Sequence, residues 1–436
     1  MYFLYSLGLS LLFVALLPYF VIQALRYGKY AGSFKQRLGR LPDSIRGDGR
    51  RTIWLHAVSV GEFLAAKPLV DQLKRELPDY RVVVSTTTLT GQRLAQSELN
   101  RIDGAFYFPF DWRFAVRRSL DWANPSIVII LETELWPNFL RECRKRGVIT
   151  ILANGRISSR SFRRYRIVRS FINRVIEDLS LMIMQTDADA ERARELGAPE
   201  DRVRVCGNLK YDQTGDGGWG LGVGKEFEAT DSDKEIDRQF ALSASSHLIV
   251  AGSTAPGEEE MLLAALRKIR THAELEDTRL LIAPRHPERF DEVARLIAKS
   301  GFKFARRSET SSSSQADVIL LDTIGELASV YRFAAVVFVG GSLVPRGGHN
   351  IIEPAAFAKP IIVGKHTGNF RQIVSDFADA GALVQIDSNH LAEALVQLLS
   401  DRALAHEMGD QARGILLANR GACERTIAAI KDVRAI

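Results

Sequence analysis

Short runs of apolar residues alternate along the chain with longer segments in which apolar residues recur every three or four positions. A continuous apolar run of roughly four to eight residues is typical of a strand that is buried on both faces. The longer segments, such as residues 62–77 and 134–146, have the period of an amphipathic helix. This alternation predicts a parallel sheet with helices on both faces. In the first half of the chain the strand-like runs lie at residues 52–56, 81–85, 127–131, 149–153 and 181–184.

The same alternation restarts after an interruption at residues 212–245. This stretch is first rich in glycine and then acidic, without periodicity, which predicts an interdomain loop or linker. The predicted fold class is therefore α/β, with one doubly wound, Rossmann-like domain at residues 26–211 and a second at residues 246–436. Two such domains predict a cleft between them, lined by the loops that follow the strands. In the second domain the strand-like runs lie at residues 248–252, 280–283, 318–321, 335–339, 360–363 and 382–385.

The N-terminal segment has a different character. Residues 2–25 contain no charged side chain, and 24 helical residues reach about 36 Å, enough to cross a bilayer. A signal peptide would need a charged start and a small-residue cleavage site, and neither is evident. Residues 1–25 are therefore predicted to form a membrane-anchor helix, although Ser10 and Pro18 leave open a segment that only dips into the bilayer. Basic residues follow at once, and the positive-inside rule places both domains on the cytoplasmic side. These residues are Arg26, Lys29, Lys35, Arg37, Arg40 and Arg46.

Composition adds mainly exclusions. A hydrophobic fraction of 46% and a charged fraction of 25% are those of a globular protein. The three cysteines lie far apart without a CxxC pair, which argues for a reducing compartment and against structural zinc. The histidines show no ligand spacing, and Asp187 and Asp189 are better explained by the start of a helix than by a metal-binding DxD motif. We therefore predict neither a metal site nor a resident cofactor.

A glycine-rich stretch at residues 336–364 is the strongest candidate for a ligand site. A buried strand breaks at Gly340, and a second glycine pair precedes a helix predicted to open at Asn350. Glycines let the backbone approach a ligand closely, and a helix N-terminus offers N–H groups to an anion. Glu353, one turn into this helix, could accept hydrogen bonds from two ribose hydroxyls. The Asn-x-x-Glu spacing is also that of a capping box, so both interpretations stay open.

Three other loops of the second domain follow strands and have related chemistry. Ser253 lies in a loop whose amides could meet an anion, and Arg285 could grip a phosphate through two bonds. Gly325 allows a close backbone approach in the third loop. Together with the glycine-rich stretch, these loops predict a nucleotide site. Neither domain begins with GxGxxG or GxxxxGK[ST], which argues against a dinucleotide dehydrogenase and a P-loop NTPase.

The first domain holds the candidates for acid–base chemistry. Glu62 opens the helix after the first strand, where the helix dipole alone would also favour a carboxylate. The segment ETELWPN follows a later strand, and its Glu132 or Glu134 could orient a catalytic group. Lys210 ends the domain and could reach a leaving phosphate.

A basic segment at residues 156–174 interleaves arginines with aromatic residues. It is either a solvated helical face or a surface that meets anionic lipid or a phosphorylated lipid substrate. Nucleic acid is disfavoured by the predicted anchor. The arginines proposed for an acceptor or membrane surface are Arg156, Arg160, Arg163 and Arg164.

Taken together, these motifs resemble the 3-deoxy-D-manno-octulosonic acid (Kdo) transferase family of lipopolysaccharide synthesis. The resemblance runs in the family's order over most of the chain. One departure is Ala255-Pro256, where the family often carries a histidine. The motifs that carry the resemblance are SVGE (59–62), TTTLTG (86–91), ETELWPN (132–138), NGRIS (154–158), GNLKYD (207–212), PRHPER (284–289), DTIGEL (322–327) and GGSLVPRGGHNIIEPA (340–355).

The resemblance implies a GT-B fold and a metal-independent, inverting glycosyltransferase that moves Kdo from CMP-Kdo to a lipid A precursor at the inner membrane. It implies that Glu62 is the general base, supported by Glu134 and Lys210. Cleavage of a sugar–phosphate bond fits these residue types, since it needs cations near phosphate and a carboxylate near the incoming hydroxyl. The CMP contacts that the resemblance implies are Pro284, Arg285, Gly325, Glu326, Leu327, Asn350, Ile351, Ile352 and Glu353.

Two other classes remain as alternatives. One is a GT-B transferase or epimerase that uses a UDP-sugar. The other is a membrane-tethered nucleotide-binding protein whose catalytic domain has degenerated, although intact Glu62, Lys210 and Arg285 argue against it.

Overall fold

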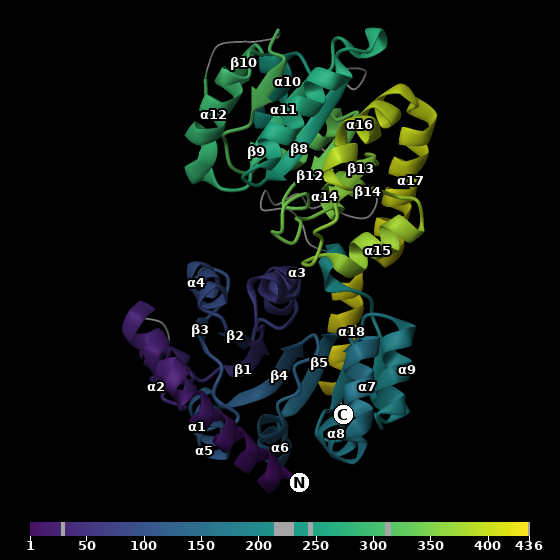
Figure 1. The fold of residues 1–436 in the computed structure, drawn as a ribbon. Coiled ribbons are helices and arrows are strands. Elements are labelled where there is room, and N and C mark those ends of the chain that lie inside the picture. Colours follow the sequence, from purple (N-terminus) through teal and green to yellow (C-terminus); the bar gives the residue numbers. More distant parts are fainter. Residues whose placement is uncertain (28–30, 213–230, 243–246, 310–314, 435–436) are drawn as a thin grey trace. The chain divides into compact units, whose positions relative to one another are not determined.

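The computed structural model describes residues 1–27, 31–212, 231–242, 247–309 and 315–434. The chain divides into two compact units, one made of Met1–Gln213 with Asn419–Ile436 and the other of Thr214–Ala418 (Figure 1). Each unit is built around its own seven-stranded sheet, in which all paired strands are parallel. The predicted α/β class with two parallel-sheet domains is confirmed. Most of the predicted interdomain loop, residues 213–230 and 243–245, lies outside the described residues.

The sheet of the first unit has the strand order β3-β2-β1-β4-β5-β6-β7. Each of its faces is covered by its own apolar cluster, which explains why the strands read as continuous apolar runs. Two strands that the pattern did not predict, β3 and β7, have partly buried or exposed residues beside their buried ones, so neither forms a continuous apolar run. The strands are β1 (Arg51–His56), β2 (Tyr80–Thr86), β3 (Gly104–Tyr107), β4 (Pro125–Leu131), β5 (Ile149–Gly155), β6 (Leu181–Met184) and β7 (Val203–Val205).

The helices of the first unit connect successive strands or cover the faces of the sheet. They are α1 (Tyr2–Tyr27), α2 (Ala31–Arg37), α3 (Val60–Glu76), α4 (Leu89–Ser97), α5 (Arg113–Ala123), α6 (Pro137–Lys145), α7 (Ser159–Ile167), α8 (Arg169–Ile176), α9 (Asp187–Glu195) and α18 (Ala422–Arg434), with single 3-10 turns at Asp43–Ile45, Glu200–Arg202 and Leu209–Asp212.

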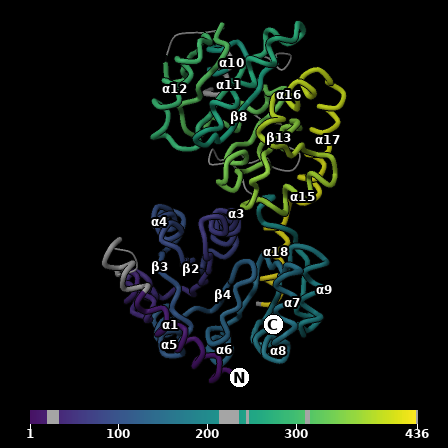
Figure 2. Tube along the Cα trace, in the orientation of Figure 1, coloured from purple at the N-terminus to yellow at the C-terminus, as the bar shows by residue number. Residues whose placement is uncertain are grey.

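Helix α18 belongs to the first unit, whereas the sequence places it in the second domain. Its apolar residues, including Ile427 and Ile430, join the core cluster on one face of the first sheet. Asp212 fixes the start of the helix by accepting hydrogen bonds from the backbone N–H groups of Gly421 (2.8 Å) and Cys423 (2.6 Å). Figure 2 traces the chain back to a C-terminus among the helices of the first unit. Sequence order alone gives no sign of this return.

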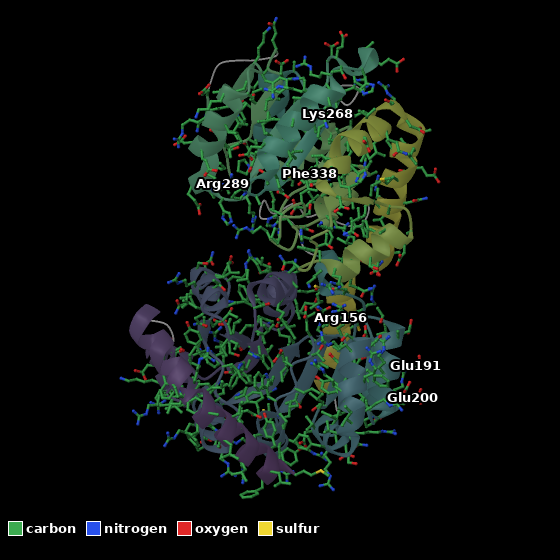
Figure 3. All side chains as sticks on the ribbon, viewed as in Figure 1. Arg156, Glu191, Glu200, Lys268, Arg289 and Phe338 are labelled. Atoms are coloured by element: carbon green, nitrogen blue, oxygen red, sulfur yellow. The ribbon has the colours of Figure 1, made fainter. Side chains whose placement is uncertain are left out.

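The sheet of the second unit has the order β10-β11-β9-β8-β12-β13-β14. Phe338 on β12, next to the central strand β8, is fully buried within the unit and is labelled in Figure 3. The strands are β8 (Leu248–Thr254), β9 (Arg279–Pro284), β10 (Phe304–Arg306), β11 (Val318–Leu320), β12 (Val336–Val339), β13 (Ile361–Gly364) and β14 (Val384–Ile386).

One helix of the second unit corrects the predicted linker. Helix α10 (Asp231–Phe240) forms within the stretch predicted as aperiodic loop, and Ile236 and Phe240 are buried. Two apolar residues four positions apart are enough for one helix face, but too few to stand out from the polar sequence around them. The other helices are α11 (Glu258–Ile269), α12 (Phe290–Lys299), α13 (Leu327–Val330), α14 (Ile352–Ala356), α15 (Arg371–Asp379), α16 (Leu391–Ser400) and α17 (Arg402–Asn419), with 3-10 turns at Ala273–Leu275, Pro287–Arg289, Tyr331–Phe333 and Ser388–His390.

The predicted N-terminal helix forms, as α1, but it packs along the first unit. The Tyr2 hydroxyl donates to Asp178 (2.6 Å), and Trp112 Nε1 donates to Ser10 Oγ (3.1 Å). Among the described residues, no helix is long and apolar enough to cross a membrane. The polar side chains on one side of α1 account for its packing, because their hydrogen-bond partners lie on the first unit.

Candidate active site

Three carboxylates gather at one edge of the first sheet. Glu62 follows β1, and Glu132 and Glu134 follow β4, its neighbour in the sheet. Because parallel strands end at the same edge, the two loops emerge side by side. Electrostatic coupling of Glu62 to both other carboxylates confirms that they lie close together. The site predicted from ETELWPN and SVGE is therefore one cluster within the first unit.

The Glu62 side chain is held in place by the start of α3. Its Oε2 accepts a hydrogen bond from the backbone N–H of Val58 (2.7 Å), and its Oε1 accepts one from the Ser59 hydroxyl (3.0 Å). Ser59 Oγ in turn accepts from the Glu62 N–H (3.4 Å), so Ser59 is the N-cap of α3 and the two side chains bond to each other. The first-turn role that the sequence left open is therefore present.

The pKa of the same carboxyl group suits a general base. Burial and, after it, the charge of the neighbouring Glu132 together raise the pKa of Glu62 to about 7, against two hydrogen bonds that lower it. A carboxyl group with a pKa near 7 is partly ionised at neutral pH and can accept a proton there. Capping and proton transfer are thus compatible functions of one side chain.

Glu132 links the carboxylates to the predicted lysine. Its backbone has φ of 57°, in the left-handed region. Residues other than glycine rarely adopt this region, and those that do are enriched at functional sites. Lys210 Nζ lies 3.5 Å from Glu132 Oε1. Burial, followed by the charge of Glu132, raises the pKa of Glu134. One ammonium group therefore faces a cluster of three carboxylates.

Lys210 is positioned by an asparagine that the sequence analysis did not single out. Asn154, at the end of β5, accepts a hydrogen bond from the Leu209 N–H through Oδ1 (3.0 Å). Gln185 Nε2 donates to the Asn154 carbonyl oxygen (3.0 Å). Asn154 is also in the left-handed region, with φ of 54°. The Asn-Gly pair after a strand was the available signal, since such pairs mark backbone with positive φ.

The basic segment forms α7 and most of α8, and the residues just before α7 lie beside this cluster. Phe162 and Tyr165 pack on the core, while Arg160, Arg163 and Arg164 are exposed. Arg156 is partly buried (labelled in Figure 3), and its carbonyl oxygen accepts a hydrogen bond from the Thr133 hydroxyl of the ETELWPN loop. The charge of Glu134 contributes to the raised pKa of Tyr165, so α7 passes close to the carboxylates.

In the second unit, one buried glutamate joins the loops after β8 and β12. Glu258 is fully buried and accepts four backbone hydrogen bonds, two at each carboxylate oxygen. The sequence analysis missed it because GEEE reads as an ordinary helix start. The donors and their distances are the N–H groups of Ala255 (2.8 Å), Gly341 (2.7 Å), Ser342 (3.0 Å) and Leu343 (2.9 Å).

Close backbone contact between these two loops requires Gly340. A Cβ atom at this position would lie 2.4 Å from the carbonyl oxygen of Ser253. Ser253 has φ of 55°, so the predicted anion-binding residue also lies in unusual backbone. Both predicted loops therefore form one rigid platform at the edge of the second sheet.

The two arginines of PRHPER have different surroundings. Arg289 is buried and paired with Glu259, with Nη1 2.7 Å from Oε1. The Arg285 side chain is exposed, and its N–H donates to the carbonyl oxygen of Thr254 (3.1 Å). His349 lies near Arg285, since burial and then this arginine lower the pKa of His349 to about 4. An uncharged imidazole and an exposed guanidinium thus lie on the predicted nucleotide side, next to buried Pro284.

Asn350 and Glu353 bond to each other at the start of α14. Asn350 Nδ2 donates to Glu353 Oε1 (3.1 Å), and Asn350 Oδ1 accepts from the Ile352 N–H (3.0 Å). The helix begins at Ile352, two residues later than predicted, and has only five residues. Glu353 also raises the pKa of the buried Tyr331, so the two side chains are near one another. Local bonding of this kind leaves both the capping and the ribose-binding interpretation of Glu353 open.

The remaining predicted loop contains Gly325, Glu326 and Leu327. The Glu326 carboxylate is paired with Arg307, with Oε1 2.9 Å from Nη2. Gly325 has φ of 90°, which only glycine adopts readily. This loop is therefore suited to present its backbone rather than its carboxylate.

No group of three or more His, Cys, Asp or Glu side chains suited to a metal ion is found in the part of the chain that the structure describes. Asp189 caps α9 instead. The Thr186 hydroxyl donates to Asp189 Oδ2 (2.7 Å), and Thr186 Oγ1 accepts from the Asp189 N–H (3.2 Å).

Comparison with known proteins gives the same family as the motifs. Residues 32–213 match the family model described as 3-deoxy-D-manno-octulosonic-acid transferase, and residues 259–414 match the model for glycosyl transferases group 1. The 3-deoxy-D-manno-octulosonic acid transferase of Haemophilus influenzae is 34% identical over 383 residues, which cover 87% of this chain and 86% of the relative. The enzyme of that name from Bordetella pertussis is 34% identical over 394 residues, covering 87% of each chain.

Solved structures show the fold. A UDP-GlcNAc 2-epimerase from Neisseria meningitidis has a TM-score of 0.56 at 13% identity, covering 87% of this chain and 100% of its own. A glycosyltransferase from Rickettsia africae has a TM-score of 0.53 at 14% identity, covering 88% of this chain and 99% of its own. Both likenesses support a GT-B-like fold with two parallel-sheet domains.

Proposed function

The chain belongs to the Kdo transferase family of glycosyltransferases, and we propose that it moves Kdo from CMP-Kdo to a hydroxyl group of a lipid A precursor, lipid IVA, with inversion at the sugar. The observation that carries this proposal is the partly ionised Glu62 carboxyl, fixed by Val58 and Ser59 among like charges. Such a group is suited to activate a hydroxyl nucleophile at neutral pH. The relatives from Haemophilus influenzae and Bordetella pertussis support the sugar.

In the proposed reaction Glu62 accepts the proton of the acceptor hydroxyl. The oxygen then forms a bond to the anomeric carbon of Kdo, and the bond from that carbon to the phosphate oxygen breaks. CMP leaves with the electron pair. Inversion follows because the incoming oxygen approaches opposite the leaving phosphate.

Glu134 and Lys210 support the transition state in this proposal. Lys210 supplies positive charge, held by the Leu209–Asn154 hydrogen bond and paired with Glu132. A fixed cation stabilises negative charge that develops on a leaving group without needing to reorganise. Neither step requires a metal ion or a resident cofactor.

The second unit is proposed to bind the donor. Arg285 meets the phosphate, Ser253 and the platform fixed by Glu258 approach it with backbone, and Glu353 accepts hydrogen bonds from the ribose. The loop with Glu326 contributes through backbone groups, because its carboxylate is paired with Arg307. The full set of proposed donor contacts is Ser253, Pro284, Arg285, Gly325, Glu326, Leu327, Asn350, Ile351, Ile352 and Glu353.

Because the proposed acceptor is a membrane lipid, we propose that the enzyme acts at the cytoplasmic face of the inner membrane. We propose that α1 supplies the attachment and that Arg156, Arg160, Arg163 and Arg164 face the phosphorylated lipid. Helix α7 begins close to the carboxylate cluster, and its arginines are exposed. A phosphorylated lipid bound to these arginines could therefore place its sugar near Glu62. Nucleic acid is not a proposed partner.

One assay tests this function. Purified full-length protein is incubated with CMP-Kdo and lipid IVA, and the products are weighed by mass spectrometry. Transfer adds the mass of one or more Kdo residues and releases CMP. Competition by CMP but not by UDP would exclude the UDP-sugar alternative, whereas binding of CMP without product would favour a degenerate nucleotide-binding protein.

A further inference from the structure

Helix α1 has a polar stripe that fixes it to the first unit. Besides the Tyr2 and Ser10 bonds, Asn138 Nδ2 donates to Ser6 Oγ (3.0 Å). These three positions are four residues apart, so they lie on one side of the helix. Phe13 extends the stripe, with its ring centroid 4.8 Å from that of Trp112. A helix that crossed a bilayer away from the domain would leave these polar groups in lipid, where each unsatisfied group is costly.

The opposite side of α1 is apolar and exposed. Its large side chains are 42% to 76% exposed along the described part of the helix. Single exposed apolar residues are common on soluble proteins, but a continuous stripe of them marks a surface that binds something. These side chains are Phe3, Leu4, Leu7, Leu11, Leu12, Val14 and Leu16, whereas Leu17, four residues after Phe13, is exposed on the other side.

The surface beside this stripe is positively charged. Arg117 pairs with Glu142 (2.8 Å) and Arg144 with Asp178 (3.1 Å), yet the arginine side chains are 47% and 56% exposed while the carboxylates are 4% and 7% exposed. The acids are therefore turned inward and the cations outward. An apolar stripe bordered by cations is the pattern of a helix that binds an anionic membrane surface.

A groove continues the same surface between α1 and α5. It has a volume of about 700 Å³ and is lined by Ser6, Ser10, Trp112, Arg113, Phe114 and Arg117. In Figures 1 and 2 the two helices lie next to each other on the same side of the first unit. Its arginines and aromatic rings match a phospholipid, with cations for the phosphate and an apolar surface for the chain.

We propose that α1 lies flat in one leaflet of an anionic membrane, with its apolar stripe in the lipid and its polar stripe on the first unit, and does not cross the bilayer. This inference rests on the proposed function for the choice of a membrane as partner. It goes further in naming the surface that docks and the orientation of the helix.

Depth measurements on the full-length protein test the orientation. All three native cysteines are buried, so a cysteine introduced on the surface can be spin-labelled selectively. The labels go one at a time on Leu4→Cys, Leu7→Cys, Leu11→Cys and Val14→Cys, with phosphatidylcholine vesicles containing phosphatidylglycerol. Leu4 and Val14 are about 15 Å apart along the helix axis at 1.5 Å per residue. A flat helix gives one shallow depth at all four positions, whereas a helix along the membrane normal gives depths that differ by about this distance and overturns the proposal.

The control label is Leu417→Cys, half exposed on α17 of the second unit, which should remain in water with and without vesicles. The Leu11 label should also be in water before vesicles are added. If it is already protected there, a second copy of the chain covers the stripe, and the bilayer is the wrong partner.

Vesicle flotation tests the surface itself. The double variant Leu11→Gln/Val14→Gln should bind phosphatidylglycerol vesicles at least tenfold more weakly, whereas Leu417→Gln should bind like the unaltered protein. Unaltered protein that binds pure phosphatidylcholine equally well would refute the anionic partner. Kdo transfer to detergent-dispersed lipid IVA is measured in parallel. Transfer without vesicle binding would overturn this inference alone, and vesicle binding without transfer would overturn the proposed function alone.

Discussion

Replacement of Glu62 by glutamine separates its two roles. Glutamine keeps the size of the side chain and a carbonyl oxygen that can accept the Val58 hydrogen bond, and its amide can bond to Ser59. Losing the charge should therefore cost the fold at most about one ordinary hydrogen bond, roughly 0.5–1.5 kcal/mol. Glutamine cannot accept a proton, and loss of a general base typically slows a reaction by about 10²–10⁴-fold.

The raised pKa adds a stability effect whose sign can be worked out. The folded protein holds the Glu62 proton up to a pH of about 7, whereas an ordinary glutamate releases it near 4.5. Between these values the folded state binds more protons than the unfolded state, so the free energy of unfolding falls as pH rises. At 1.36 kcal/mol for each pH unit, the change in pKa from 4.5 to about 7 corresponds to about 3 kcal/mol in the free energy of unfolding. The glutamine variant lacks this loss and should gain stability relative to the unaltered protein as pH rises from 4.5 to 7.

Two measurements decide the matter. Urea denaturation at pH 5 and pH 8 gives the stability difference, and Kdo transfer followed by mass spectrometry gives the rate. The pH profile of kcat/KM should show an acid limb near pH 7 that the variant lacks. Glu424→Gln is the control, because it also removes a first-turn carboxylate from a helix of the first unit, but one that is exposed. A variant that transfers Kdo at nearly the original rate would refute the reasoning, and Glu132 or Glu134 would become the candidate base.

Three further predictions concern the donor and the metal. Glu258→Gln replaces an oxygen that accepts two N–H bonds by an NH₂ group, so calorimetry should show CMP affinity at least tenfold lower, whereas Glu260→Gln, exposed in the same turn, should bind normally. Arg285→Ala and Glu353→Ala should each weaken CMP binding by about ten- to a hundredfold, since a charge-assisted bond contributes roughly 1.5–3 kcal/mol. If Glu353→Ala lowers the melting temperature but leaves CMP affinity unchanged, Glu353 only caps α14. Activity should survive EDTA, and a loss restored by magnesium would point to Asp187 and Asp189.

The sheets could be predicted from sequence because their strands are buried on both faces. A strand such as β4 is apolar at nearly every position and therefore stands out. Strands such as β10, in which only the middle residue is fully buried, give no such signal. Helix α10 was missed because its two buried apolar residues are too few to stand out, and α18 was assigned to the wrong unit because its attachment depends on its contacts and not on its own pattern. The packing of α1 was missed for the same reason, since its serines bond to residues more than a hundred positions away.

The candidate site was predictable residue by residue but not as a geometry. Glu62 could be chosen because it follows a strand and opens a helix. Its acidity depends on Glu132, and only the pairing of β1 with β4 brings the two together. Glu258 looks like one of three similar glutamates at the start of α11 until β8 and β12 are seen to pair. Strand order therefore determines which site residues come together, and the local sequence does not specify strand order.

Two glutamates at helix starts show how surroundings divide the work between the units. Both oxygens of Glu258 are occupied by four backbone N–H groups, so its charge is matched by donors and it acts as a fixed anchor for the loops. Glu62 accepts only two hydrogen bonds in the described structure, one from a backbone N–H and one from a hydroxyl, and it faces like charges, so its ionised form is less favoured. A carboxylate rich in donors holds a loop, and one poor in donors is ready to take a proton. Glutamine in place of Glu258 should therefore mainly weaken ligand binding. Glutamine in place of Glu62 should mainly slow catalysis.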